Sequence, residues 1–353
     1  MTITASLSAE DKLERLESYR EARDKAVAWL LRQLNPDGSI CDPKTGFIYY
    51  RAPWTFTVVG ETAAATAMCA WIRRHLVTPD GRIDGSYRVF DDWVTYRDAT
   101  LIVGASLAMQ YDLSHGLWPG LLALKDPQSG IFPSDRLPGG GMSDAMDVTD
   151  GGPGCGFAAL AVGDLGTARG IARFLARLWD AQPALPHHFY HVWSRSRQAI
   201  ITEADPEFDA TIMLLDNTLD APQYWFFGGI CAAFLCRLWL ADPRPEYLEL
   251  ARWYQAFAMD STDAQFKYGQ VCKGSWGASL LYQITGERQY EAFAYRMGDW
   301  YLGRQEAEGW WHPNPVDGAP VEPGDVIEVT LEFVMHLDTL IGGLASRPPS
   351  EGR

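Results

Sequence analysis

Apolar positions recur along most of this chain with the spacing of α-helices, and short turns separate the helical runs. Residues 276–284 are small and apolar on nearly every side, as in a helix that is buried all round. Residues 289–304 are amphipathic, with Tyr290, Phe293 and Met297 on one face. A tight connection at residues 285–287 joins the two runs, so the pattern predicts a hairpin of one buried helix and one covering helix.

The same alternation of small-residue runs and amphipathic runs continues through the chain. Buried inner helices are predicted at residues 58–75, 95–111, 154–162, 224–240, 276–284 and 327–344. Covering outer helices are predicted at 10–34, 114–125, 166–181, 245–258 and 287–304, and the outer helix expected between the first two inner ones is not evident. The pattern indicates an all-α, (α/α)6 toroid with short hairpin turns, one domain over residues 9–346, and tails at 1–8 and 347–353.

A turn motif accompanies these helices. Near the end of the chain a helix leads into Gln305, Gly309 and Trp311, and residues 33–40 repeat the pattern with Ile40 in place of the tryptophan. This helix-then-Q-x(2–5)-G-x-W pattern resembles the repeats of the terpenoid cyclase and protein prenyltransferase α/α toroids. The resemblance implies an α/α toroid and an aromatic-lined site.

A second group of toroids competes with the first. The six-hairpin glycosidases and unsaturated glucuronyl hydrolases share this architecture, and residues 189–196 resemble a turn in the latter. A typical class II cyclase also has a second toroid, for which 353 residues leave no room. Because a fold alone does not fix a function, both branches stay open.

The composition of the chain limits its possible binding partners more than it limits the reaction that it could catalyse. The formal net charge of -15 argues against a nucleic-acid or anionic-membrane partner. The 14 Trp, 15 Tyr and 15 Phe residues fit either a large helical core or an aromatic-lined cavity. The six cysteines show no CxxC spacing, the N-terminus is polar, and no run of about eighteen apolar residues occurs. We therefore expect a cytoplasmic protein with no membrane span, a small-molecule substrate and a possible homodimer.

The most distinctive candidate for chemistry is the loop from Asp147 to Gly156. The loops before the inner helices of a toroid converge on one mouth, where helix N-termini favour carboxylates. Class II terpenoid cyclases place a DxDD motif at such a position, and this loop resembles it in its first and last acids. Thr149 stands where the family's proton donor would be, so Asp150 or Asp147 would have to act. Alternatively, Asp150 caps the following helix and the glycines only allow tight packing.

Other carboxylates are placed similarly. The adjacent carboxylates Asp91 and Asp92, together with Asp98, could act in acid/base catalysis or bind a divalent cation. Alternatively, they are only surface residues at the start of a helix. Glu328 and Glu332 lie four apart on an otherwise apolar helix, which is unfavourable unless they line a polar cavity. In a glycosidase, Asp98 and Asp150 would be the acid and base pair.

The predicted substrate contacts are mostly aromatic. They are Trp54, Trp93, Tyr96, Cys155, Tyr224, Trp225, Trp276 and His191. His187, His188 and His191 would suit a metal only on a helix, and the preceding Pro186 favours a turn. The D-x-C of the prenyltransferases and the Cys-His-Gly motif of the lanthionine cyclases are absent, so neither metal nor cofactor is expected. The lone helix histidines His115 and His336 are interpreted as structural.

Three functional hypotheses follow. The first is a metal-independent cyclase or isomerase, in which Asp150 or Asp98 protonates an isoprenoid-like substrate and aromatic rings stabilise the resulting cation. In this scheme Glu328 or Asp92 takes the final proton. The second is a carbohydrate-active hydrolase that uses the same carboxylates. The third is a toroid that serves as a binding scaffold.

Overall fold

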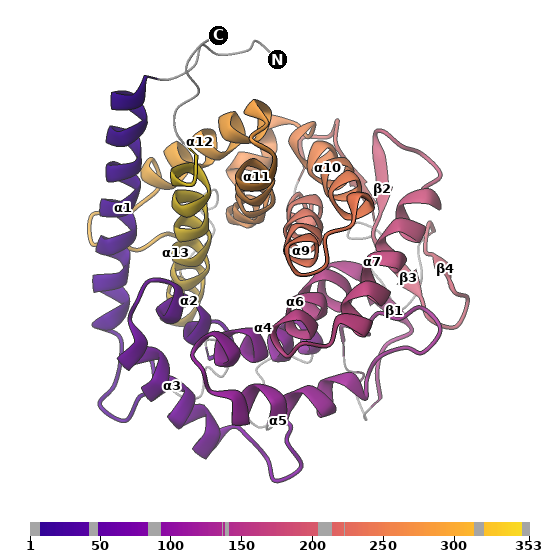
Figure 1. The fold of residues 1–353 in the computed structure, drawn as a ribbon. Helices are drawn as coiled ribbons and strands as arrows, with labels where there is room; N and C mark the ends of the chain where they lie inside the picture. The colour runs from indigo at the N-terminus through magenta and orange to yellow at the C-terminus, as the bar shows by residue number, and fades with distance from the viewer. Residues whose placement is uncertain are drawn as a thin grey trace.

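The computed structural model describes residues 8–41, 49–83, 93–135, 137, 141–203, 214–221, 223–313 and 321–347. Within them, α-helices form two concentric rings, which confirms the predicted α/α toroid (Figure 1). The inner ring consists of α2 (Ala52–Val58), α4 (Val94–Leu107), α6 (Cys155–Ala161), α9 (Phe227–Ala241), α11 (Cys272–Thr285) and α13 (Pro323–Ala345). The outer ring consists of α1 (Ala9–Leu31), α3 (Thr62–His75), α5 (Tyr111–Leu122), α7 (Leu165–Asp180), α10 (Pro245–Met259) and α12 (Arg288–Leu302).

The contacts between helices close the inner ring. Each inner helix packs against the next in the order α2, α4, α6, α9, α11, α13, and α13 packs back against α2. Each outer helix follows its inner partner along the chain, except that α1 begins the chain and packs on the last inner helix, α13. Because an outer helix returns the chain every time, the inner helices run parallel and their N-termini meet on one side of the toroid.

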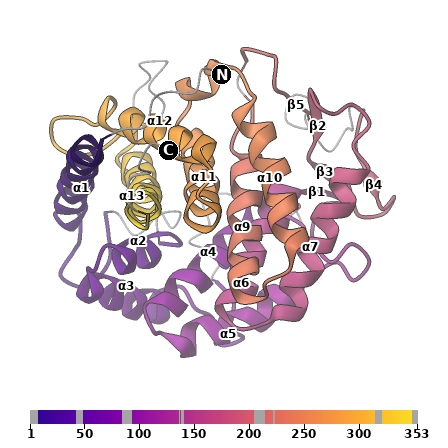
Figure 2. The same cartoon turned by 45° about the horizontal axis from the view of Figure 1, so that its top comes forward.

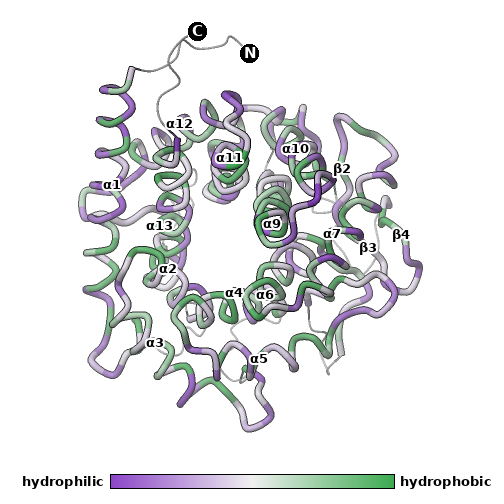
Figure 3. Tube along the Cα trace, in the orientation of Figure 1, coloured by the Kyte–Doolittle hydropathy of each residue, from purple (hydrophilic) through white to green (hydrophobic). Residues whose placement is uncertain are grey.

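Hydropathy separates the two rings. On the outer helix α7, Ile171, Leu175 and Leu178 are buried while Arg173 and Arg177 are exposed. The inner helix α9 is apolar around most of its circumference and nearly all of it is buried (Figure 3). At the start of the first helix, the Ser8 hydroxyl caps the chain by accepting a hydrogen bond from the Asp11 amide at 3.1 Å.

The first inner helix is not where the sequence pattern predicts it. The structure divides the predicted run 58–75 and makes most of it the outer helix α3, whereas the inner helix is the short α2 before it. Gly60 ends α2 with a φ of 86°, a conformation that glycine adopts without strain. The alanines at the start of α3 made it resemble a buried helix. The outer helix that the pattern did not reveal is therefore α3 itself.

The repeated turn is confirmed at both ends of the chain. Gly309 has a φ of 109°, and the side-chain amide of Gln305 donates to its carbonyl at 3.0 Å. Isolated β-bridges close three such turns, at Leu34 with Ile40, Val77 with Ile83, and Gln305 with Trp311. Trp311 and Ile40 are both fully buried, so the isoleucine fills the position of the tryptophan in the first repeat.

Short strands, which the pattern does not predict, lie at the rim beside α7 (Figure 2). One sheet has the order β1 (Ala145–Asp147), β3 (Val192–Ser194), β4 (Ala199–Ile200), and the other pairs β2 (His188–Tyr190) with β5 (Leu214–Asp216). All of the pairings are antiparallel, and Asp147 faces Val192 in the register. The segment 187–191 is thus not helical, as its proline suggests.

Three short helical turns complete the described chain. They are a π-helical turn η2 (Asp150–Gly154) and the 3-10 turns η3 (Asp263–Lys267) and η4 (Gly269–Val271). The first leads directly into α6 and the last directly into α11. Among the described helices, none combines the length and the apolar character that crossing a bilayer requires.

Close packing of α9 on α11 should depend on Gly229. A Cβ atom at this position would lie 2.6 Å from the Gly274 Cα and would also overlap the Lys273 carbonyl. We expect Gly229→Ala to lower the free energy of unfolding by ~2–3 kcal/mol, since an overpacked helix contact must separate. Urea unfolding followed by circular dichroism measures the change.

Gly342→Ala is the matched control, because Gly342 lies on the inner helix α13 and a Cβ atom there meets nothing within 4 Å. It should leave stability unchanged or raise it by up to about 1 kcal/mol. Equal effects of the two alanines would contradict the close approach of α9 and α11.

Candidate functional site

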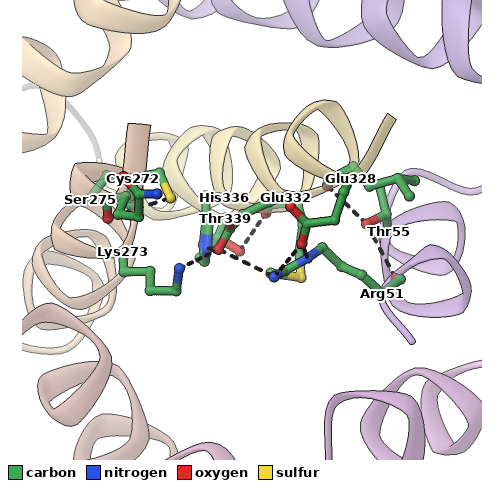
Figure 4. A network of polar contacts seen from close by, with 12 residues as sticks. Arg51, Thr55, Cys272, Lys273, Ser275, Glu328, Glu332, His336 and Thr339 are labelled. Carbon is green, nitrogen blue, oxygen red and sulfur yellow. Dashed lines mark hydrogen bonds and ion pairs between the residues drawn. The ribbon is translucent and has the colours of Figure 1, made fainter. Parts of the chain in front are cut away.

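Buried charges gather where the N-terminal parts of α2, α11 and α13 meet (Figure 4). Arg51, the residue before α2, places its Nε 3.0 Å from Glu328 Oε1 and its NH1 3.2 Å from Glu332 Oε1. Lys273 Nζ approaches the same Glu332 oxygen at 2.5 Å, and the Tyr50 hydroxyl donates to Glu328 at 2.5 Å. We call Arg51, Lys273, Glu328 and Glu332 the charged layer.

The charged layer pairs two basic with two acidic side chains, and the ionised forms of Glu332 and Lys273 stabilise each other. Burial alone would raise the pKa of the Glu332 carboxyl, but the charges of Arg51 and Lys273 outweigh it and hold this pKa well below its usual range. Burial would lower the pKa of Lys273, but the Glu332 charge raises it above its usual value. Two cations thus face two acids inside the ring, a pairing that makes their burial tolerable.

An aromatic layer lies one helical turn deeper. Trp54 follows Arg51 by three positions and Trp276 follows Lys273 by three, so each projects from the same face of its helix as the charge before it. The two indole rings meet edge to face with centroids 5.6 Å apart. Phe157 from α6 stacks on Trp276 at 4.4 Å. The interior therefore changes from charged to apolar along the ring axis.

His336 belongs to both layers. It follows Glu332 by one turn of α13, with its Nε2 3.5 Å from Glu332 Oε1, and its ring centroid lies 5.0 Å from that of Trp276. The ring is fully buried, and its Nδ1 has no hydrogen-bond partner among the described residues. Burial lowers the pKa of His336 to about 4, so the imidazole is neutral at pH 7.

Asp150 stands across the ring, at the start of η2. It is only 8% exposed, and its side chain forms no hydrogen bond within the described part of the chain. Burial raises the pKa of its carboxyl well above the usual range, and the negative charges of Asp147 and Asp135 raise it further. The cations Lys273 and Arg97 act in the opposite sense. These surroundings favour the protonated, neutral form of the Asp150 carboxyl.

Neighbouring groups hold the Asp150 turn in place. Asp147, on β1, accepts a hydrogen bond from the Thr149 amide at 2.8 Å and lies 3.3 Å from Nδ1 of the fully buried His191. The Tyr96 ring fills the space beside Gly154, where a Cβ atom would come within 2.7 Å of it. Asp150 itself makes no capping hydrogen bond, so of the alternative interpretation only the packing role of the glycines is supported.

Tyr96 connects the Asp150 turn with the charged layer. Its ring centroid lies 5.9 Å from the Arg51 guanidinium carbon and 6.2 Å from the Tyr50 ring. Lys273 completes the other side, with its Nζ 4.7 Å from the centroid of the Phe226 ring that precedes α9. The acid, the charged layer and the aromatic layer thus share one interior.

The structure brings several of the other predicted residues to this interior. Cys155 begins α6 and is fully buried, with its Sγ 3.6 Å from the Asp150 carbonyl. Burial raises the pKa of the Cys155 thiol well above its usual value, and the charge of Asp98, half-buried on α4, acts in the same direction. Tyr224 lies beside His191, with ring centroids 5.3 Å apart.

Two predicted contacts have a different setting, and one acid cannot be placed. Trp93, at the N-cap of α4, is 41% exposed. Trp225 is buried before α9, and its Nε1 lacks a hydrogen-bond partner among the described residues. Asp92, like Asp91, falls outside the described residues.

One cluster has the composition of a metal site. Single ligand atoms of Cys272, Glu332 and His336 lie within 4.8 Å of one another. Burial raises the pKa of the Cys272 thiol well above its usual value, so a cation would have to displace the thiol proton. Arg51 and Lys273 also occupy the Glu332 carboxylate. We therefore assign no metal to this cluster.

The other histidines bind protein groups at the rim. His187 Nδ1 lies 3.2 Å from the Asn217 side-chain oxygen, and His188 Nε2 lies 3.3 Å from an Asp216 oxygen. Both partners belong to the small sheet at the rim or to the residue next to it. This geometry does not bring the histidines together as metal ligands.

Sequence reasoning missed three members of the site, whereas it singled out Glu332 together with Glu328. Arg51 was overlooked because the first inner helix was placed too late in the chain, and Lys273 was given no role. A lone lysine at the start of a helix that is apolar on every side was the available signal. His336 was interpreted as structural, since one histidine on an apolar helix carries no signal of its own.

Comparison with known proteins places the fold but not the reaction. No protein-family model matches the chain, and no curated protein matches it. A D-mannose isomerase superposes with a TM-score of 0.63 at 15% identity, over 90% of this chain and 96% of that chain. The type II terpene cyclase MstE from Scytonema, in complex with geranylgeranyl dihydroxybenzoate, matches at 0.58 and 13%, over 94% and 99%.

A family 76 glycoside hydrolase from a bovine Bacteroides thetaiotaomicron strain also matches, with a TM-score of 0.58 at 13% identity, over 90% of this chain and 77% of that chain. Both groups of toroids that the turn motif and architecture suggest are therefore among the structural neighbours. At these identities the similarity establishes a shared α/α toroid fold.

Removing one member of the charged layer should destabilise the fold. Glu332→Gln leaves Lys273 and one side of Arg51 without a counter-charge inside the ring. We expect it to lower the free energy of unfolding by about 3–5 kcal/mol, as urea unfolding at pH 7 would measure. The double variant with Lys273→Met should recover part of this loss.

Asp112→Asn is the control, because the Arg73–Asp112 pair is solvent-exposed. Its effect should be within about 1 kcal/mol. A Glu332→Gln protein as stable as this control would show that the charged layer contributes no net stability.

Proposed function

We propose that the protein is a metal-independent cyclase or isomerase that starts carbocation chemistry by protonating an isoprenoid-like, apolar substrate. The observation that carries the proposal is the setting of Asp150, which is buried and without a hydrogen-bond partner among the described residues, so that the pKa of its carboxyl is raised. A carboxylic acid in that state has a proton to deliver and no protein acceptor for it. An alkene is a poor base, so a donor in an apolar setting is what this chemistry needs.

The surroundings of Asp150 would also stabilise the charges that form when its proton has been transferred to the substrate. The new carboxylate would feel the positive charges of Lys273 and Arg97, both of which favour its ionised form. The substrate cation would lie above the aromatic layer of Trp54, Trp276 and Phe157, whose π systems attract positive charge. After proton transfer, the negative charge on Asp150 would lie near Lys273 and Arg97, and the positive charge on the substrate near the aromatic layer. Groups that stabilise both charges are therefore in place before the reaction.

The composition of the interior favours an apolar substrate. Within the described residues, the acids Glu328 and Glu332 are already paired, and the deeper layer offers aromatic rings rather than amide side chains. A sugar would need many hydrogen-bonding partners around it. The cyclase MstE binds geranylgeranyl dihydroxybenzoate, and its match spans nearly all of both chains, so the length of this chain does not argue against cyclase chemistry.

A carbohydrate-active hydrolase is the second candidate, and one observation favours it. Asp150 and Glu332 have pKa values shifted in opposite directions, which is the pattern of an acid and a base. Against it, Arg51 and Lys273 both engage the Glu332 carboxylate, which makes it a poor base for activating water. We therefore rank it below the cyclase, with a non-catalytic scaffold third.

Replacing Asp150 should remove turnover. Asp150→Asn keeps the shape of the side chain but has no proton to give, so conversion of polyprenyl and prenylated-arene probes should fall by about 10²–10⁴-fold. The assay uses mass spectrometry of products, without added metal, beside a panel of aryl and unsaturated glycosides. Asp180→Asn, at the exposed end of α7, is the control and should retain activity.

The panels separate the candidates. Turnover of glycosides alone would replace the cyclase with the hydrolase, and turnover of neither panel by the wild-type protein would favour the scaffold. Full prenyl turnover by Asp150→Asn would leave Asp98 as the donor to examine.

The pH profile should depend on Asp147. The charge of Asp147 raises the pKa of Asp150, so Asp147→Asn lowers that pKa and lets Asp150 ionise at a lower pH. The donor is active when protonated, and the alkaline limb of the turnover profile should therefore move to lower pH. Rates measured across pH 5 to 9 test this, and an unmoved limb would mean that another group sets the profile.

A further inference from the structure

Carbocation chemistry needs a base as well as an acid, and the carboxylates predicted for that task are poorly placed for it. Glu328 is bound by Tyr50 and Arg51, and Asp92 falls outside the described residues. A base for the last step must be uncharged or anionic at working pH, reach the cation, and have a free lone pair. The described interior contains a buried group with an unpartnered ring nitrogen.

That group is the imidazole of His336. The ring is fully buried on the inner helix α13, and Figure 4 shows it projecting beside Glu332 from the side of the helix that faces Lys273. Its Nδ1 has no hydrogen-bond partner among the described residues. Its ring centroid lies 5.0 Å from that of Trp276, in the aromatic layer where the substrate cation would rest.

The carboxylate of Glu332 fixes which nitrogen can accept a proton. Nε2 lies 3.5 Å from Glu332 Oε1, so a proton on Nε2 is electrostatically favoured and the lone pair is left on Nδ1. The same carboxylate would stabilise the imidazolium that forms, in the way that an acid supports a catalytic histidine. Lys273 and Arg51 keep this acid ionised.

We propose that His336, through Nδ1, is the base that ends the reaction by removing a proton from the substrate cation. This proposal rests on the proposed function. A C–H bond next to the cationic carbon breaks, its electron pair forms the product double bond, and the proton goes to Nδ1. Asp150 supplied one proton at the start, so the reaction is an isomerisation once solvent has returned the proton from His336 to Asp150.

Charged and titratable groups face His336 from three elements. They are Glu332 on α13, Lys273 and Cys272 on α11, and Arg51 before α2. Burial, with the repulsion of Lys273 and Arg51, outweighs the attraction of Glu332, and the pKa of His336 falls to about 4. So weak a base suffices, because a proton beside a carbocation is strongly acidic. Burial thus favours the unprotonated imidazole of His336, as it favours the protonated carboxyl of Asp150.

The first test needs no substrate. In the full chain labelled with ¹⁵N-histidine, NMR at pH 7 should show His336 with a proton on Nε2 and none on Nδ1, and without titration between pH 8 and 5. The chain has seven histidines, and the signals of His336 are assigned as those that disappear in His336→Gln, or in His336→Asn if the first variant does not fold. A charged ring, or a proton on Nδ1, would overturn the proposal.

The second test uses protonated N,N-dimethyldodecylamine, whose apolar chain and ammonium group imitate a substrate cation. Binding should shift the Nδ1 resonance of His336, since this nitrogen would face the charge. If the amine binds inside the ring and the Nδ1 resonance does not move, His336 is not in contact with the substrate. If neither this amine binds nor any prenyl probe reacts, the proposed function itself falls and takes the base with it.

The third test is the product made by His336→Gln from a prenyl probe that the wild-type protein converts. The rate of forming the wild-type product should fall about tenfold or more, with other alkene isomers or water-trapped alcohols in its place. Consumption of the probe should fall less, because Asp150 still donates. His115→Gln, exposed on α5, is the control. An unchanged product with normal turnover would show that another base ends the reaction.

Discussion

The structure depends on the ion pairs of Arg51 with Glu328 and Glu332, because they join the first inner helix to the last. Arg51 and Glu328 are 277 residues apart in the sequence, yet Arg51 Nε lies 3.0 Å from Glu328 Oε1. A toroid has to be closed at one place, and here the closure is polar. The Thr55 hydroxyl adds a hydrogen bond to the Leu331 carbonyl at 2.9 Å at the same junction. Because a buried charge without its partner is strongly unfavourable, this contact also selects the correct register of α13 on α2.

Closing the ring in this way also builds the site. The charge before α2 and the charge at the start of α11 meet the acids of α13, and the residues one turn deeper on the same helices are therefore brought together as well. Trp54 and Trp276 take their places because Arg51 and Lys273 are held in theirs. The helical period thus converts one layer of ion pairs into a second, apolar layer below it.

The architecture could be predicted from the sequence because it depends on the local periodicity of apolar residues. Hairpins such as α11 and α12, with Gly286 in a left-handed conformation between them, need only the alternation of buried and amphipathic runs and a turn residue. The placement of α2 failed because seven helical residues give too short a pattern, and the alanines of α3 are equally compatible with burial. The short strands were not predicted for a similar reason, since ladders of three residues are determined by tertiary contacts rather than by their own sequence.

The site was predictable only where residue type alone is informative. Asp150 stood out because a DxDD-like loop is unusual, whereas its neutral state results from burial and from Asp147, which no sequence pattern shows. Arg51 and Glu328 could not be paired in advance, because their contact depends on the ring being closed. His336 could not be distinguished from a packing residue, because its distinguishing feature is that the buried Nδ1 has no hydrogen-bond partner among the described residues, which the sequence does not show.

Burial acts on Asp150 and on His336 in chemically opposite ways and for the same reason. In each case the uncharged form is favoured, so the pKa of the acid rises and the pKa of the imidazole falls to about 4. One buried interior can therefore hold a protonated acid and an unprotonated base at the same pH, whereas in water the pKa of an aspartic acid lies below that of an imidazole and the two states do not coexist. The charged layer makes this possible, because Arg51 and Lys273 satisfy Glu332 and prevent that carboxylate from taking the proton of Asp150. The ion pairs that close the toroid thus also keep its acid and its base apart.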